Sequence, residues 1–469
     1  MIILGTNSIK DTGFDVDNSL RINQGDSSYL KKTFGTATNR RKFTYSFWCK
    51  KQHNTDMGIL STGADANNRG IMYFNDSGDF NFLEVTSGSV TSFVATNRLF
   101  RDSSAWYHFV IAVDTTQGTN TNRVKIYVNG IQETSLAQTT YMNQNYDGNF
   151  NASARHDISS ANGYGEDGYY WNGYLAEVVF IDGQQLAPTS FGEFDEDSGI
   201  WKPIDVSGLT FGTNGFYLDF EDSANLGNDA NGGTDLTEVN LAATDQSTDT
   251  CTTNFCLINP LDKYIGGTLA TYSEGNTRFS SSGNSSSNNG TRCNFAVANG
   301  KWYWEVKLIQ NAFRFGIQDV DAAIQYSSGS NFNIVGTYAV QNNGAKSINN
   351  TESASAVTTF SNGDTAMMAM DLENQKLYFG VNGTWSNSGN PESGSSGTGS
   401  IGDLVAGTTY IPVFSNGAWA QNTIADFNFG NPAYSISSSN TDGDGYGNFE
   451  YAVPSGYFSL NTKNLAEYG

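Results

Sequence analysis

Residue types able to perform acid–base or nucleophilic chemistry are few in this 469-residue chain. The three histidines are His53, His108 and His156, and no Gly-x-Ser-x-Gly elbow accompanies them, so a Ser-His-Asp hydrolase lacks its usual signature. His108 lies within an alternating apolar run, where a hydrogen-bonded structural histidine is expected. The chain has no phosphate-binding Gly-x-x-x-x-Gly-Lys-Ser/Thr loop and no Cys/His spacing suited to zinc. These patterns predict no enzyme, no cofactor and no metal.

Acidic clusters offer the remaining catalytic and metal-binding alternatives. The stretch Glu193–Ser198 approaches the Glu-x-Asp-x-x-Glu pattern of jelly-roll glycosidases, but Ser198 stands where the last carboxylate is needed. We therefore expect a solvated acidic loop there. Asp442-Gly443-Asp444-Gly445 is similar to the start of a calcium loop, but Val453 replaces the closing Glu. Asp65 and Asp76–Asp79 are comparable loop acids, for which ordinary turns are expected.

Two loops carry residues better suited to ligand binding. Aromatic rings stack on the apolar faces of sugars, while carboxylates and amides hydrogen-bond to hydroxyls. The loop Asn162–Tyr170 combines both kinds, and a tryptophan in the segment 416–419 has loop-like neighbours. Core packing is the alternative for aromatic residues near a strand, above all Trp171. The predicted ligand-binding residues are Tyr164, Glu166, Asp167, Tyr169 and Trp419.

Alternation of apolar and polar residues predicts the β-strands that must position these loops. In Lys42–Lys50, Phe43, Tyr45, Phe47 and Cys49 share one face, with Trp48 an exception on the other. Trp302–Leu308 places its tryptophans, Val306 and Leu308 inward and Glu305 outward. Asn129-Gly130 and Asn382-Gly383 follow such runs and predict type I′ hairpin turns.

The fold predicted from these patterns is all-β, with two antiparallel β-sandwiches (jelly rolls) in tandem. Helix is minimal: Pro188–Phe194 has one capping-box spacing, Ser190 with Glu193. Residues 1–220 form the first predicted domain and 268–469 the second. The stretch 221–267 is rich in Asn, Asp, Thr and Gly without a regular apolar pattern, so we predict an irregular connector.

Charge and cysteine usage restrict the partners and the compartment. With 47 acidic and 25 basic residues, the net charge of −22 disfavours nucleic acids and anionic membranes. No apolar run approaches the ~18 residues of a membrane span, and no signal peptide follows Met1, so we expect cytosolic synthesis without membrane insertion. The four cysteines are expected as free thiols, with Cys251–Cys256 as an alternative pair: Cys49, Cys251, Cys256 and Cys293.

Two series of motifs resemble known domain families. The first resembles a laminin-G-like, concanavalin A-type jelly roll of phage and bacterial surface proteins, and comprises Ser19–Asn23, Phe43–Trp48, Trp106–Val110, Lys125–Gly130 and Trp171–Val178. The second resembles a SPRY domain and comprises Gly300–Val306, Phe315–Ile317, Asp371–Glu373, Leu377–Phe379, Val381–Trp385 and Asn428–Gly430. A jelly roll followed by a SPRY-like domain looks like virion proteins of tailed phages, notably marine ones.

The resemblance implies a non-enzymatic virion surface protein, made in the host cytoplasm. It would be an adhesion or receptor-binding module of a tail fibre or spike. The implied partners are other virion proteins, a host cell-surface glycan or protein, and further copies of the chain, including a homotrimer. A capsid decoration, knob or horn-like head protein is the first alternative, because the jelly roll begins by about residue 20 without a coiled coil. A polysaccharide-degrading jelly-roll enzyme is the second.

Overall fold

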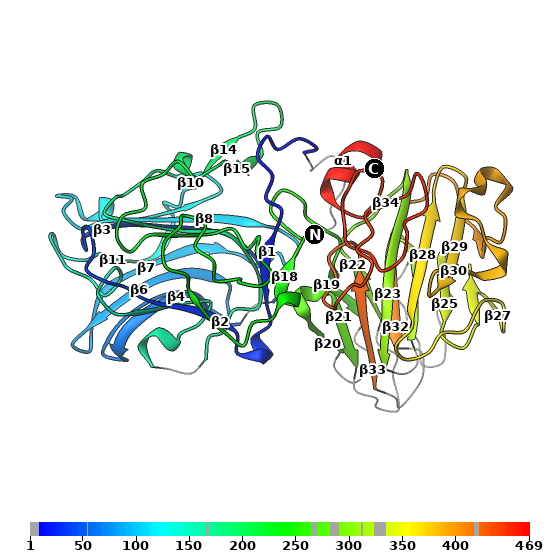
Figure 1. The fold of residues 1–469 in the computed structure, drawn as a ribbon, viewed down its shortest axis with the longest axis horizontal. Coiled ribbons are helices and arrows are strands. Elements are labelled where there is room, and N and C mark those ends of the chain that lie inside the picture. Colours follow the sequence, from blue (N-terminus) through cyan, green and yellow to red (C-terminus); the bar gives the residue numbers. More distant parts are fainter. Residues whose placement is uncertain are drawn as a thin grey trace. The chain divides into compact units, whose positions relative to one another are not determined.

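The structure is a computed structural model that describes residues 9–53, 55–165, 168–264, 270–281, 290–310, 313–322, 334–416 and 422–469. The chain divides into two compact units, Thr12–Thr252 (the N-terminal unit) and residues 253–469 together with 9–11 (the C-terminal unit). Each unit is a sandwich of mainly antiparallel sheets (Figure 1), which confirms the predicted all-β fold. Within the described residues the one α-helix is α1, Thr462–Tyr468. None of the helices described there is long and apolar enough to cross a bilayer.

Two antiparallel sheets make up the N-terminal unit. The first has the order β10-β9-β8-β3-β13-β1-β18, with β16 also on β13, and its strands are β1 (Ser19–Ile22), β3 (Lys42–Lys51), β8 (Tyr107–Asp114), β9 (Val124–Val128), β10 (Ile131–Gln132), β13 (Gly173–Asp182), β16 (Phe216–Leu218) and β18 (Gln246–Ser247). The second has the order β11-β7-β6-β5-β4-β12-β2-β17, and its strands are β2 (Tyr29–Thr33), β4 (Met57–Asp65), β5 (Asn68–Phe74), β6 (Asp79–Thr86), β7 (Ser89–Leu99), β11 (Leu136–Thr140), β12 (Arg155–Ile158) and β17 (Thr237–Val239).

The core of this unit forms between the two sheets, as the alternation predicts. Phe43, Tyr45 and Phe47 of β3 point inward and meet Phe80 and Phe82 of β6 in one apolar cluster. Aromatic pairs such as Phe47 and Phe80, with ring centroids 6.4 Å apart, join the layers. Burial of this apolar area is the main force that holds the sandwich together.

A further layer covers the outer face of the first sheet and explains why Trp48 breaks the alternation. The segment 183–217 packs over that face and buries side chains that would otherwise meet water. His108 stacks on Trp48, hydrogen-bonds to Ser46 through Nε2 at 2.8 Å, and accepts from Trp201 Nε1 at 3.0 Å. Burial lowers the pKa of His108 to about 3, so it is the neutral structural histidine that was predicted.

The predicted helical turn at 188–194 forms only in its first half. Pro188–Ser190 is a single 3-10 turn, and the chain then enters β14 (Gly192–Phe194), which pairs with β15 (Trp201–Pro203). The capping box does not form, because Glu193 lies in β14 and its carboxylate reaches Lys202, with Oε1 and Nζ 3.5 Å apart.

The stretch 221–267 differs from the irregular connector that the composition predicts. β17 pairs with β2 and β18 pairs with β1, so residues up to Thr252 complete the N-terminal unit. The strand β19 (Ile258–Tyr264) already belongs to the C-terminal unit. The composition hides these strands because both β17 and β18 are short and lie at sheet edges, where backbone hydrogen bonds need no apolar pattern.

Two further sheets make up the C-terminal unit. The first has the order β19-β22-β32-β24-β25-β26-β27, with β22 (Gly290–Cys293), β24 (Phe313–Asp319), β25 (Thr337–Gln341), β26 (Lys346–Ile348), β27 (Thr351–Ser353) and β32 (Tyr410–Asn416). The second has the order β20-β21-β33-β23-β28-β29-β30, with β20 (Ala270–Ser273), β21 (Arg278–Ser281), β23 (Lys301–Gln310), β28 (Thr365–Asp371), β29 (Lys376–Val381), β30 (Thr384–Trp385) and β33 (Thr423–Asn428); β31 (Gly402–Asp403) joins β29 and β34 (Phe458–Ser459) joins β23.

In strand β23 one face lies in the core, as predicted, whereas the other face is not exposed to solvent as predicted. Trp302, Trp304, Val306 and Leu308 lie in the core. Glu305, expected on a solvated face, is buried, because the chain after β33 crosses over it. Its carboxylate accepts hydrogen bonds from the backbone N–H of Tyr451 at 2.8 Å and of Glu450 at 3.0 Å, and so fixes that crossing segment.

Both predicted Asn-Gly hairpin turns are present. Asn129 and Gly130 have φ of 48° and 79° and join β9 to β10, while Asn382 and Gly383 have φ of 49° and 80° and join β29 to β30. Positive φ at both residues is the type I′ requirement, which Asn and Gly meet at little steric cost.

Candidate functional site

A polar face on the second sheet of the N-terminal unit is the strongest candidate site. Leu30, Ile158 and Leu60 lie opposite one another in β2, β12 and β4 and point into the core. Because side chains alternate along a strand, their neighbours point to the outer face. These neighbours are Tyr29 and Lys31 of β2, Arg155 and Asp157 of β12, and Ser61 of β4.

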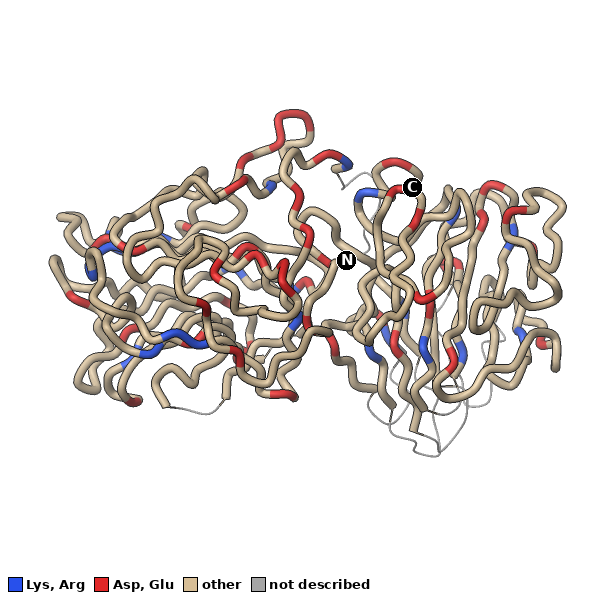
Figure 2. Tube along the Cα trace, in the orientation of Figure 1, with Lys and Arg blue, Asp and Glu red and all other residues tan. Residues whose placement is uncertain are grey.

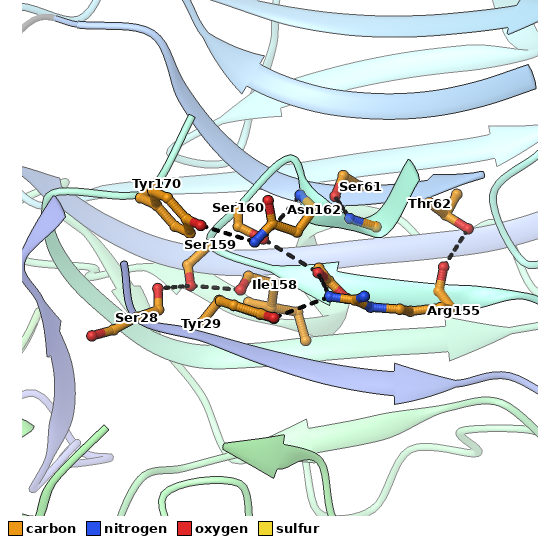
Figure 3. Close-up of polar contacts among 12 residues, drawn as sticks. Ser28, Tyr29, Ser61, Thr62, Arg155, Ile158, Ser159, Ser160, Asn162 and Tyr170 are labelled. Carbon is orange, nitrogen blue, oxygen red and sulfur yellow. Dashed lines mark hydrogen bonds and ion pairs between the residues drawn. The ribbon is translucent and has the colours of Figure 1, made fainter. Parts of the chain in front are cut away.

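The chain following β12 folds back over this outer face (Figure 3). The backbone N–H of Gly163 donates to Ser61 Oγ at 3.0 Å, and that of Gly58 donates to the carbonyl of Tyr169 at 2.6 Å. A Cβ atom on Gly163 would lie 2.2 Å from the carbonyl oxygen of Ser61, so only glycine allows this close approach. The loop is therefore fastened to the sheet at both of its sides.

An ion pair and its hydrogen bonds order the centre of the face. Arg155 donates from Nε to Asp157 Oδ1 at 2.7 Å and from Nη2 to Asp157 Oδ2 at 2.5 Å. The same Nη2 donates to the hydroxyl of Tyr29 at 3.2 Å, and the guanidinium lies 5.6 Å from the Tyr29 ring centroid. Ser160 Oγ completes the set by donating to Asp157 at 3.4 Å. Figure 3 shows these side chains converging from β2, β12 and the loop.

Burial differs between the two partners of this pair. The Asp157 side chain has no exposed surface, whereas that of Arg155 is 39% exposed. Burial raises the pKa of Asp157, an effect opposed by its bonds to Arg155. The hydrogen bond to Asp157 in turn raises the pKa of Arg155. A fork between guanidinium and carboxylate is a strong, geometrically specific contact, so the exposed edge of Arg155 is held in one position.

The tyrosine that contacts this arginine, Tyr29, lies beside a second half-buried tyrosine, Tyr170. The rings of Tyr29 and Tyr170 lie with centroids 6.3 Å apart and planes tilted by 33°. Asn162 Nδ2 donates to the Tyr170 hydroxyl at 3.0 Å and fixes the second ring. Two adjacent rings of fixed orientation beside polar groups suit a ligand with both apolar and hydrogen-bonding faces.

Arg155 also lines a cleft of about 510 Å³. Lys31, Lys32 and Arg155 line it together with Asp235 and Thr237, whose segment contains the edge strand β17. This volume lies within the usual range for small-molecule sites. The residues that line the cleft thus include members of β2 and β12 and of the stretch 221–267, which the composition predicts to be a connector.

The structure separates the predicted ligand-binding residues. Tyr164 is only 5% exposed, and its ring packs against Ile71 and Ala161. The Arg69 guanidinium lies 5.2 Å from the centroid of this ring. A side chain buried in this way does not face a ligand, which corrects the prediction for Tyr164. Tyr169 is half-buried and packs edge-on against Tyr73 at 6.2 Å. Glu166, Asp167 and Trp419 lie outside the described residues. Trp171 is fully buried, which agrees with the core alternative.

Sequence reasoning missed Tyr29, Arg155, Asp157 and Asn162 as site residues. A signal existed in the alternation of Arg155-His156-Asp157-Ile158, which places two opposite charges on one face. Their meeting with Tyr29 depends on β12 lying between β2 and β4, which local sequence does not show.

The carboxylates of the acidic loops that resemble glycosidase or calcium motifs bind groups of their own chain. Asp195 accepts from the backbone N–H and hydroxyl of Ser198 and pairs with Lys202, as expected of a solvated loop. Asp442 is buried; its Oδ2 accepts from the backbone N–H and hydroxyl of Ser459 and from Asn464 Nδ2, while its Oδ1 accepts from two backbone N–H groups. Oδ2 thus helps to dock α1 through Asn464, while Oδ1 closes the turn that contains Asp444 and Tyr446. Asp65 caps its own turn through the N–H groups of residues 67 and 68.

The four cysteines, Cys49, Cys251, Cys256 and Cys293, are free thiols, as predicted. Cys251 and Cys256, the alternative pair, fall on either side of the boundary between the units. Burial raises the pKa of the Cys49, Cys251 and Cys293 thiols, which makes them poor nucleophiles.

Comparison with known proteins supports the fold of the N-terminal unit. A family model described as the concanavalin A-like lectin/glucanases superfamily matches residues 24–186, and the unit has this laminin G-like sandwich. No match was found among curated proteins.

Solved structures with similar folds come from several kinds of protein. The SPRY domain of human HERC1 is 13% identical over 36% of this chain and 96% of its own, with a TM-score of 0.29. A heptameric SAP-like pentraxin from Limulus polyphemus is 19% identical over 37% and 80%, with a TM-score of 0.27. Domains LG4-5 of the mouse laminin alpha1 chain are 10% identical over 90% of each chain, with a TM-score of 0.29. None of these similarities is close enough to decide a function.

Proposed function

We propose that the protein is a non-catalytic recognition protein whose N-terminal unit binds a glycan on the outer face of β2, β12 and β4. The observation that carries this proposal is the pair of adjacent rings Tyr29 and Tyr170 beside the Arg155–Asp157 fork, whose arginine also lines a 510 Å³ cleft. Tyrosine rings stack on the apolar faces of sugars, and fixed polar groups bind the hydroxyls. The match to a lectin/glucanase superfamily is consistent with this use of the fold.

The wider setting of this proposal is the virion of a tailed phage. It is supported by the order of the sequence motifs, in which a laminin-G-like jelly roll precedes a SPRY-like sandwich. In this setting the protein recognises a host surface glycan as part of a tail fibre or spike, beside other virion proteins. Cryo-EM of purified particles tests this setting: density on the tail supports it, whereas density on the capsid favours the decoration role.

Binding to an array of bacterial surface glycans tests the proposed site. We expect the purified protein to retain at least one glycan, and Tyr29→Ala and Tyr170→Ala to weaken that binding about tenfold or more, since a stacked ring contributes about 1–2 kcal/mol. Tyr141→Ala is the matched control, because Tyr141 is a half-buried tyrosine of the same unit outside this face. Equal loss in all three variants, or no loss in any, would contradict the site.

An assay for released reducing sugar addresses the hydrolase alternative. We expect no release from any retained polysaccharide, because Glu193 and Asp195 pair with Lys202 instead of flanking a cleft. Release that Glu193→Gln abolishes would replace binding with hydrolysis as the function.

A further inference from the structure

Two cationic groups on the proposed binding face retain free donors. Arg155 uses Nε and Nη2 for Asp157 and Tyr29, and its Nη1 donates no hydrogen bond to any described residue. Lys31 forms neither an ion pair nor a side-chain hydrogen bond within the described part of the chain. Both line the same cleft.

The strand register places these two groups near each other. Lys31 lies directly opposite Asp157 in the β2–β12 ladder, and Arg155 is two residues from Asp157 on the same face. Diagonal neighbours of this kind have Cα atoms roughly 7–8 Å apart, within the reach of two long side chains. A ligand group in the cleft can therefore contact Lys31 Nζ and Arg155 Nη1 together.

The carboxylates that balance these cations lie beneath them. Asp157 and Asp229, the partners of Arg155 and Lys32, have fully buried side chains. Asp235 is the acid that lines the cleft, and its oxygens accept from the Asp229 N–H at 3.1 Å and from Asn225 Nδ2 at 2.9 Å. A ligand in the cleft thus has three basic groups and the Asp235 carboxylate within the lining, while Asp157 and Asp229 are shielded from it.

Three basic residues and one acidic residue line the cleft, a ratio that is unusual for the chain. Acidic residues outnumber basic ones by 47 to 25, and in Figure 2 red acidic positions exceed blue basic ones along the described trace. A neutral ligand gains little from such groups, whereas an anion gains charge-assisted hydrogen bonds that are about twice as strong as neutral ones.

We propose that the ligand of this face is an anionic glycan, whose carboxylate or sulfate lies between Lys31 Nζ and Arg155 Nη1 while a sugar ring packs on Tyr29 and Tyr170. This inference rests on the proposed glycan binding and specifies its substrate class. Arg155 acts as the oriented donor, since Asp157 fixes its plane, and Lys31 supplies the mobile second charge.

An array of acidic glycans beside their carboxyl-reduced or desulfated counterparts tests the inference. We expect the full-length protein to prefer the acidic member of at least one pair by about tenfold, because a hydrogen bond to a charged group contributes about 1.5–3 kcal/mol. The carboxylated and the sulfated pairs identify which anion is bound. The preference should fall as salt rises, because exposed charges are screened.

Variants at Lys31 separate the charge from the rest of the site. Lys31→Gln should remove most of the acidic preference, measured as the ratio of the affinities for the acidic and the neutralised glycan, and Lys31→Arg should restore it. Lys125→Gln, which removes the same charge from β9 in the other sheet, is the matched control and should change nothing.

The outcomes distinguish this inference from the proposed function. Equal retention of acidic and neutralised glycans overturns the anionic class while glycan binding stands. An acidic preference that Lys31→Gln leaves intact overturns the placement of the anion at Lys31. Retention of no glycan by a protein with an intact melting transition overturns both.

Discussion

Glu177 is a single residue that should make the stability of the N-terminal unit depend on pH. It is buried at a bulge in β13, where it has φ of 49° and accepts a hydrogen bond from the Tyr217 hydroxyl at 2.7 Å. Burial, with help from Asp219 and Glu221, raises its pKa from 4.5 to about 8. The folded chain thus keeps a proton between these pH values that the unfolded chain has released. The free energy of unfolding should therefore fall as pH rises through this window.

Replacement of Glu177 by Gln tests this pH dependence. The amide still accepts from Tyr217 but does not ionise, so Glu177→Gln should match the wild type below pH 4.5 and exceed its stability above pH 8. The gain should be on the order of 5 kcal/mol, at about 1.36 kcal/mol for each pKa unit. Urea unfolding of the unit across this pH range measures it, with the exposed Glu193→Gln as control. If the unfolding free energies of the wild type and Glu177→Gln change in parallel with pH, Glu177 is already ionised in the folded protein across this range.

At the scale of elements, a buried ion pair fastens the end of the N-terminal unit. Asp249, just after β18, accepts from Lys50 Nζ of β3 and from Trp106 Nε1 at 3.0 Å, and its carbonyl accepts from Ser19 Oγ of β1 at 2.6 Å. The Lys50 and Asp249 side chains are almost completely buried. The last residues of the unit are thus tied to two strands of the first sheet.

Asp249→Asn should destabilise the N-terminal unit by about 3–5 kcal/mol, because the Lys50 ammonium stays buried without its carboxylate. Thermal unfolding measures the change. Asp147→Asn removes a surface partner of Arg41 and should leave the midpoint almost unchanged, since exposed ion pairs contribute little. Similar midpoints for both variants would mean that water or another group solvates Lys50.

At the scale of the whole molecule, each unit carries its own core, so each should fold alone. Fragments 12–252 and 253–469 should be soluble and melt cooperatively, with circular dichroism spectra of β structure. A fragment 12–220 loses β17 and β18 and the Asp249 contacts, which exposes the edges of β2 and β1, and it should aggregate. Cooperative melting of 12–220 at the same temperature as 12–252 would contradict this boundary.

Self-association also belongs to this scale. A net charge of −22 on each chain repels further copies at low salt, and screening at higher salt removes that barrier. We expect light scattering to report an oligomer whose population grows with salt. A monomer at every salt concentration would contradict the predicted homo-oligomer. The protein would then be held in place only by contacts with other proteins.

The sequence determined which residues form strands and which face of each enters a core. Alternation in Lys42–Lys50 and Trp302–Leu308 and the two Asn-Gly turns suffice for this, because strand periodicity and turn conformation are local properties. The same local view failed for β17 and β18, whose pairing with β2 and β1 joins segments more than two hundred residues apart.

Only the tertiary structure decided which polar residues meet. Tyr29, Arg155 and Tyr170 lie far apart in sequence and come together because β12 inserts between β2 and β4 and its following loop folds back through Gly163. Burial likewise separated Tyr164, which packs inside the loop, from Tyr170, which remains half-buried beside Tyr29. Strand order and burial depend on the packing of distant segments, and no periodicity within one segment encodes them.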